Sequence, residues 1–161
     1  MRLIYAISIL LLASMMSAQC QQTAKDWFNK GEALYNQGKY NEAVKAYDEA
    51  ISLEPNSAGL QIIKGDAFCN MGRYDEAITA FDRAIFIDPN NADAWNGKAW
   101  ALNSKGKYNE AIKACDMAIK LDPKFVLAWN NKGWALDALG RTSEAKVAFA
   151  KAKAKVLGYK R

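Results

Sequence analysis

Few side chains of this protein are of the types that carry out chemistry. Its 161 residues include no histidine and only three cysteines, Cys20, Cys69 and Cys115, whose spacing matches no metal site. Without histidine, the chain lacks the side chain that most often transfers protons near neutral pH. No phosphate-binding glycine loop and no isolated pair of carboxylates stands out. We therefore expect a protein that is not an enzyme and that holds no cofactor and no metal ion.

The chemistry that the sequence does offer is recognition by aromatic rings and carboxamides. Trp100 and Trp134 lie 34 residues apart, and asparagines recur near each of them. Indole rings supply a large apolar contact area, and a carboxamide both donates and accepts hydrogen bonds. The elements that position these groups decide what they can contact.

Both tryptophans belong to a repeat of 34 residues. The segment YNEAVKAYDEAISLEPN at 40–56 recurs in related form at 74–90 and 108–124, and more loosely at 142–158. A unit this short cannot bury its apolar face alone, so its copies are expected to stack around one elongated core. The predicted units are 24–57, 58–91, 92–125 and 126–159, within a domain that covers 23–161.

Each unit is expected to form two helices. In the third unit, small and apolar residues recur three and four positions apart over about 92–105 and again over 110–121. Gly106 supplies a permissive backbone after the first helix, and Pro123 ends the second. We predict that the Asn109 side chain caps the second helix. We also predict that Gly65, Ala99 and Gly133 let alanines of the second helices approach the backbone of the first helices.

The cysteines of the repeats are expected to be structural. Cys115 occupies the position that Tyr47, Phe81 and Phe149 hold in the other units, which predicts a small, buried core residue. A disulfide between Cys69 and Cys115 is not favoured.

The first 22 residues are typical of an export signal. Arg2 precedes sixteen residues without a charge, and small residues follow. Cleavage near Ala18 would release a soluble protein, retention would leave a membrane anchor, and lipidation of Cys20 would tether the mature N-terminus. Gln19 departs from the small residue that precedes the cysteine in bacterial lipidation motifs. We expect an exported protein that is either secreted or membrane-anchored.

The formal net charge of the chain is +5, and the excess of basic residues lies near the C-terminus. Residues 20–144 include 15 basic and 17 acidic residues, whereas residues 145–161 include six basic residues and no acidic one. Cations near a helix C-terminus stabilise the helix, so a solvated helix end is the simpler interpretation. The alternative is a basic helix that contacts a polyanion or a membrane surface.

The repeated unit closely resembles the tetratricopeptide repeat. The resemblance rests on W-x-x-K-G at 27–31 and 129–133, on G-[KR]-Y-[ND]-E-A between the two helices, and on [ED]-P-N at the end of the first two units. It covers about 24–158. The fourth unit has Thr142 in place of the tyrosine and lacks the proline, as an end cap would. The family implies an all-α fold, a right-handed α-solenoid of helix-turn-helix hairpins.

The resemblance implies a non-enzymatic scaffold for protein–protein interaction. In this family the first helices of successive units line a concave groove that takes an extended peptide or a helix of another protein. By family position, the predicted partner-binding residues are Asn29, Glu32, Asn36, Asp66, Asn70, Asn96, Trp100, Asn103, Asn130, Asn131, Trp134 and Asp137.

The family also narrows the class of partner. Members that bind the acidic tails of heat-shock chaperones use a clamp of basic residues and asparagine, and the corresponding places here hold Phe28, Glu32, Ile63, Asp93 and Gly97. This pattern favours a neutral or basic partner. We expect no nucleic acid partner, because the groove carries acids and lacks a basic stripe.

Two other hypotheses stay beside the peptide-binding scaffold. A membrane-tethered assembly factor would use the N-terminal anchor and would contact a polyanion or a membrane surface through the basic C-terminal helix. Self-association is also open, because no separate solvating helix follows the fourth unit.

Overall fold

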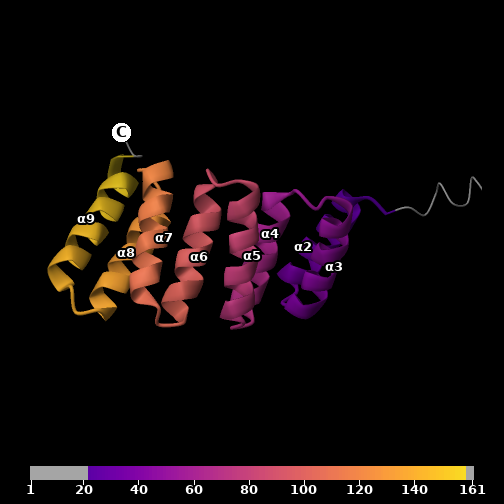
Figure 1. Ribbon diagram of the computed structural model, residues 1–161, viewed down its shortest axis with the longest axis horizontal. Coiled ribbons are helices and arrows are strands. Elements are labelled where there is room, and N and C mark those ends of the chain that lie inside the picture. The colour runs from indigo at the N-terminus through magenta and orange to yellow at the C-terminus, as the bar shows by residue number, and fades with distance from the viewer. Residues whose placement is uncertain (1–21, 159–161) are drawn as a thin grey trace, which may run out of the picture.

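The computed structural model describes residues 22–158, which form eight α-helices and no strand (Figure 1). The helices are α2 (Ala24–Asn36), α3 (Tyr40–Leu53), α4 (Ala58–Asn70), α5 (Tyr74–Ile87), α6 (Ala92–Ser104), α7 (Tyr108–Leu121), α8 (Val126–Ala138) and α9 (Thr142–Gly158). Side chains are described as far as residue 154. Cys20 and almost the whole predicted export segment lie outside the described residues. Within 22–158, no helix has the length and apolar character needed to cross a membrane.

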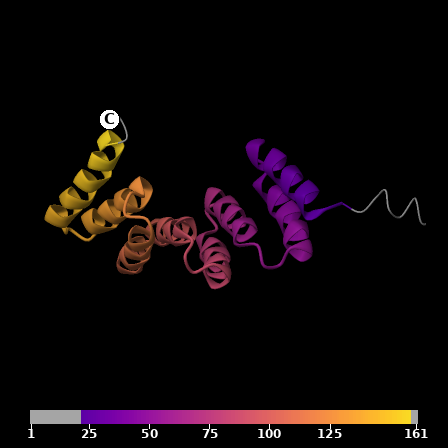
Figure 2. The ribbon, with the colours of Figure 1, turned by 90° about the horizontal axis from the view of Figure 1, so that it is seen from above.

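The helices form four hairpins in a row, and each hairpin packs on the next. The first helices α4, α6 and α8 also contact their neighbouring first helices directly, whereas the second helices α3, α5, α7 and α9 show no such extensive contact with one another. Seen from above, both ends of the row lie on the same side of its middle (Figure 2). The first helices therefore form the inner side of a curved array, as an α-solenoid requires, and the predicted all-α fold is confirmed.

A glycine in the left-handed conformation sets the turn inside each hairpin. Gly106 has a φ of 76°. Its N–H donates to the carbonyl oxygen of Asn103, and the N–H of Lys107 donates to that of Leu102, both at 2.9 Å. These two bonds cap the end of α6. The same pair of bonds recurs at Gly38, Gly72 and Gly140.

The predicted side-chain cap of the second helix is wrong. Helix α7 begins at Tyr108, so Asn109 already lies inside it, and Lys107 at the N-cap makes no side-chain cap. Lys107 follows the turn glycine directly, which leaves no place for a separate capping residue. Its ammonium group instead lies 3.3 Å from Glu110 in the first helical turn. Side-chain caps occur at three first helices, at Thr23, Ser57 and Asn91.

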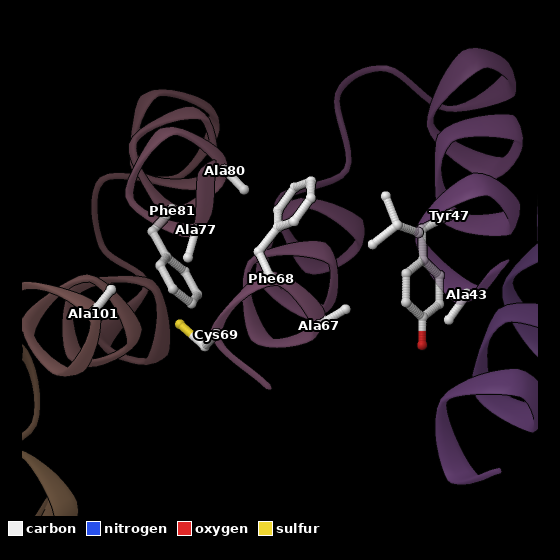
Figure 3. Packing of buried hydrophobic residues seen from close by; sticks show 10 residues of the cluster. Ala43, Tyr47, Ala67, Phe68, Cys69, Ala77, Ala80, Phe81 and Ala101 are labelled. Carbon is white, nitrogen blue, oxygen red and sulfur yellow. The ribbon is translucent and has the colours of Figure 1, made fainter. Parts of the chain in front are cut away.

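The glycines of the first helices make room for aromatic rings, which corrects the prediction that they admit alanines. A Cβ atom on Gly65 would lie 2.8 Å from the ring of Phe81, and one on Gly133 would lie 2.5 Å from the ring of Phe149. Both distances are well below van der Waals contact. Figure 3 shows the Phe81 ring beside Cys69 in the core formed by α4, α5 and α6.

The third unit changes both members of this glycine–ring pair. Cys115 replaces the ring and Ala99 replaces the glycine, and both residues are fully buried. A thiol is smaller than a phenyl ring, so the core has space for the methyl group of Ala99, which fills part of the volume that a ring would take. The prediction that Cys115 is a core residue is confirmed. Cys69 is also buried, and both thiols are free.

Lysines of the first helices tie each unit to the preceding one. Lys64 lies 2.6 Å from Asp48 on α3, and the same pairing recurs one and two units later between Lys98 and Asp82 and between Lys132 and Asp116. The aspartates are about half exposed, so each pair contributes at most about 1 kcal/mol. These three lysine side chains therefore lie against the second helices, and their charges are paired there.

Candidate functional site

The ninth position of each unit marks the inner side of the array. It holds Glu32 on α2, Asp66 on α4, Trp100 on α6 and Trp134 on α8. Each residue lies 34 positions after the previous one, so the four occupy equivalent places on parallel first helices. The N-terminal half of the inner side is therefore acidic at this position, and the C-terminal half is aromatic.

The two inner tryptophans are accessible to a partner. Trp100 is 39% exposed and Trp134 is 70% exposed. Trp95 and Trp129 are used differently, because each donates its indole N–H to the carbonyl oxygen of a proline six residues earlier, at 3.0 and 3.2 Å. Trp95 and Trp129 thus stabilise the repeat, whereas Trp100 and Trp134 present their rings to solvent.

A hollow of about 480 Å³ opens between α4, α6 and α8. Ile62, Ile63 and Leu127 supply much of its apolar wall, and Asp66 and Asp93 add two carboxylates. No lysine or arginine lines it. Leu127 is 58% exposed, so this wall is open to solvent.

A second hollow, of about 430 Å³, lies between α2 and α4. Its wall includes Phe28, Leu60 and Ile63, with Lys25 and Glu54 as its charged members. Ile63 lines both hollows. The two hollows are therefore neighbours, and together they extend the inner surface from α2 to α8.

The two acids at the ninth position have different surroundings. The hydroxyl group of Tyr47 donates a hydrogen bond of 2.7 Å to Oε1 of Glu32. The residue equivalent to Tyr47 in the second unit is Phe81, which has no hydroxyl group, and no ion pair or side-chain hydrogen bond reaches the Asp66 carboxylate from the described residues. Burial, and next the charge of Asp93, raise the pKa of Asp66 to about 6.

Several predicted partner-binding asparagines join neighbouring first helices. Nδ2 of Asn131 donates to Oδ1 of Asn96, and Nδ2 of Asn103 donates to the carbonyl oxygen of Asn131, both at 2.9 Å. Nδ2 of Asn70 lies 2.6 Å from the hydroxyl oxygen of Tyr35. These bonds link α2 to α4 and α6 to α8, a structural role that was not predicted from the sequence. Their binding role stays a prediction.

The remaining predicted residues lie on the first helices without such links. Asn29, Asn36 and Asp137 are exposed, and Asn130 is half-buried. Leu127 was not among the predicted binding residues. Its position in the repeat could have indicated it, because Leu127 occupies in the fourth unit the place that Asp93 occupies in the third.

Comparison with known protein families agrees with the geometry. A family model described as Tetratricopeptide repeat matches residues 28–92 and 63–124, and a second model with the same description matches 114–147. No curated protein matches the chain.

Several solved structures are similar to the whole array. One described as the crystal structure of MamA has 25% sequence identity and a TM-score of 0.80, over 91% of this chain and 85% of that one. MamA 41-end from Desulfovibrio magneticus RS-1 has 22% identity and a TM-score of 0.76, over 84% and 76% of the two chains. The first TPR of Spaghetti (RPAP3), bound to the HSP90 peptide SRMEEVD, has 24% identity and a TM-score of 0.71, over 74% and 94%.

Proposed function

The chain belongs to the tetratricopeptide repeat family, and we propose that it is a non-enzymatic scaffold that binds an extended peptide or a helix of a partner protein along the inner side of its solenoid. The observation that carries this proposal is the pair of exposed indoles, Trp100 and Trp134, at equivalent positions of adjacent first helices.

Exposed aromatic area of this kind is unusual on a surface that only faces water. Tryptophan is enriched among the residues that dominate binding energy at protein interfaces. Leu127, which lies on the same inner side, adds further exposed apolar surface. A contiguous apolar surface with polar neighbours is typical of a protein interaction site.

The Spaghetti (RPAP3) structure supports the peptide class of partner, since that repeat domain is bound to a peptide. The peptide SRMEEVD carries three acidic residues. The inner side of the present chain carries Glu32, Asp66 and Asp93, which would repel such a peptide. We therefore propose a neutral or basic partner segment.

The test is selection of binding peptides from a random peptide library, followed by affinity measurement with fluorescently labelled peptides. Trp100→Ala and Trp134→Ala should each weaken binding about thirtyfold, because truncation of an aromatic hot spot costs about 2 kcal/mol. Phe86→Ala on α5 is the matched control, because Phe86 is 75% exposed and lies on a second helix.

Circular dichroism should show unchanged helicity in all three variants. Affinity that both tryptophan variants leave intact would rule out this groove as the binding site.

The membrane-tethered alternative depends on the basic C-terminal helix. In the described part of α9, Nζ of Lys151 lies 4.6 Å from the centre of the Trp129 ring, so this cation packs within the fourth hairpin. Lys146 and Lys153 are exposed, and contact of this helix with a polyanion or a membrane surface stays a prediction that no observation on the described residues favours. Export of the chain remains a proposal that depends on residues 1–22 alone.

A further inference from the structure

We infer that the inner groove selects a partner peptide in which a lysine or arginine, bound in the hollow by Asp66 and Asp93, lies about three residues from a hydrophobic side chain bound by Trp100. This inference rests on the proposed function, because it specifies the class of peptide that the same groove would hold.

The hollow has the charge for a cationic side chain and has no cation of its own. Asp66 and Asp93 line it together, and no basic residue does. The lysines of α4 and α6 are paired elsewhere, since Lys64 lies 2.6 Å from Asp48 and Lys98 lies 2.6 Å from Asp82. A cation from a partner could therefore pair with these two carboxylates without displacing a lysine of α4 or α6.

The apolar walls of the hollow can contact the methylene stem of a long basic side chain. Lysine and arginine carry apolar methylene stems below their charged groups. Ile62, Ile63 and Leu127 offer apolar surface for such a stem next to the carboxylates. The volume of about 480 Å³ lies in the range of cavities that hold ligand groups.

The surroundings of Asp66 add an energetic reason for this choice of partner. Its side chain is partly buried, and burial raises its pKa to about 6. A partner cation would supply the charge-assisted hydrogen bond that the fold does not provide, and such bonds are about twice as strong as neutral ones. Glu32 gains less from a cation, because Tyr47 already donates to it.

The spacing in the peptide follows from the spacing of the first helices. Packed helices lie about 8–10 Å apart, and an extended peptide advances about 3.3 Å per residue. A peptide that crosses from Asp66 on α4 to Trp100 on α6 therefore advances about three residues. A second hydrophobic residue, about six positions from the basic one, would reach Trp134 on α8.

The test is the residue composition of peptides selected by the wild-type protein from the random library. The expected result is enrichment of lysine or arginine about three positions from leucine, phenylalanine or another hydrophobic residue. In a selected peptide, replacement of the basic residue by glutamine should weaken binding about tenfold, because loss of one partner of a desolvated charge pair is costly.

The protein side of the test uses the double variant Asp66→Asn/Asp93→Asn. It should lose about tenfold in affinity for the basic peptide and should bind the glutamine peptide within about twofold of wild type. The double variant Glu42→Gln/Glu49→Gln on α3 is the charge-matched control, because both glutamates are exposed on a second helix. It should bind both peptides as the wild type does.

The possible outcomes separate the two proposals. If no peptide is selected, or if binding does not depend on Trp100 and Trp134, the proposed function and this inference both fall. If peptides bind through the tryptophans but show no preference for basic residues, or prefer acidic ones, only this inference is overturned. The glutamine-substituted peptide keeps the test decisive even if a protein variant fails to fold.

Discussion

Replacement of Asp66 by asparagine is expected to make the protein more stable near neutral pH. The Asp66 side chain is partly buried, and no cation of the described residues pairs with it. Burial and the neighbouring Asp93 raise its pKa to about 6 from an ordinary value of 3.8. The ionised form is therefore disfavoured in the folded protein, and asparagine removes the charge while keeping nearly the same shape.

The magnitude follows from this pKa difference. A carboxyl group with a pKa of about 6 when folded and 3.8 when unfolded destabilises the fold by up to about 3 kcal/mol once it is fully ionised. The folded state binds the proton more tightly, so the contribution of Asp66 to the free energy of unfolding of the wild type should rise as the pH falls through about 6 toward 4. Asp66→Asn should gain about 1–3 kcal/mol at pH 7.5, because its amide still needs hydrogen-bond partners.

Three other ionisable groups that interact with Asp66 do not produce this pH dependence. They are Tyr35 on α2, Tyr47 on α3 and Cys69 on α4. The pKa values of the two tyrosines and of the thiol are raised above their ordinary values, so these groups stay neutral between pH 4 and 7.5.

The assay is urea unfolding followed by circular dichroism at several pH values between 4 and 7.5. The stability difference between Asp66→Asn and wild type should be largest at pH 7.5 and should shrink toward zero near pH 4. Asp93→Asn should reproduce the smaller, electrostatic part of the effect. Glu49→Gln, an exposed control, should change stability by less than about 0.5 kcal/mol.

A stability difference that does not change with pH, or an asparagine variant less stable than wild type at pH 7.5, would refute this reasoning. The carboxylate would then have a stabilising partner in the folded protein. The expected result would instead identify Asp66 as a residue that costs stability, as binding residues often do.

The repeat itself supports two further predictions. Cys115→Phe should destabilise the third unit by about 1–3 kcal/mol through overpacking against Ala99, and Ala99→Gly alone by about 1 kcal/mol. The double variant restores the pair found at Gly65 and Phe81, so urea unfolding should show a cost clearly below the sum of the two, and additive costs would contradict this account. Gly106→Ala should cost about 1 kcal/mol or more, because the φ of 76° at this turn is strained for a residue with a Cβ atom. Gly106→Asn should cost less, since asparagine tolerates this conformation better, and an alanine variant as stable as wild type in thermal unfolding would show that the turn can relax.

The sequence predicted the helices because their determinants are local and recur in every unit. Gly106 ends α6 through its own backbone conformation, and Pro123 follows the end of α7. The prediction that Asn109 caps α7 was wrong, and the reason is again local. Asn109 has a suitable side chain, but the turn is so short that the chain re-enters a helix before reaching it.

The candidate site was predicted less completely, because its properties depend on pairs of residues from different helices. Nothing in the segment around Asn131 shows that its amide bonds to Asn96 on another first helix. The role of Gly65 was assigned to the wrong partner, because the ring of Phe81 fills the space that alanines were expected to approach.

The sequence by itself determined the period of 34 residues, the succession of helical hairpins and the places of Trp100 and Trp134, because repetition and helical spacing are properties of the order of residues. Only the tertiary structure decided that Glu32 receives a hydrogen bond from Tyr47 while Asp66 lies partly buried beside Asp93 without a cation. The physical reason is that burial and electrostatic interaction depend on distances between side chains of separate helices, and packing alone sets those distances.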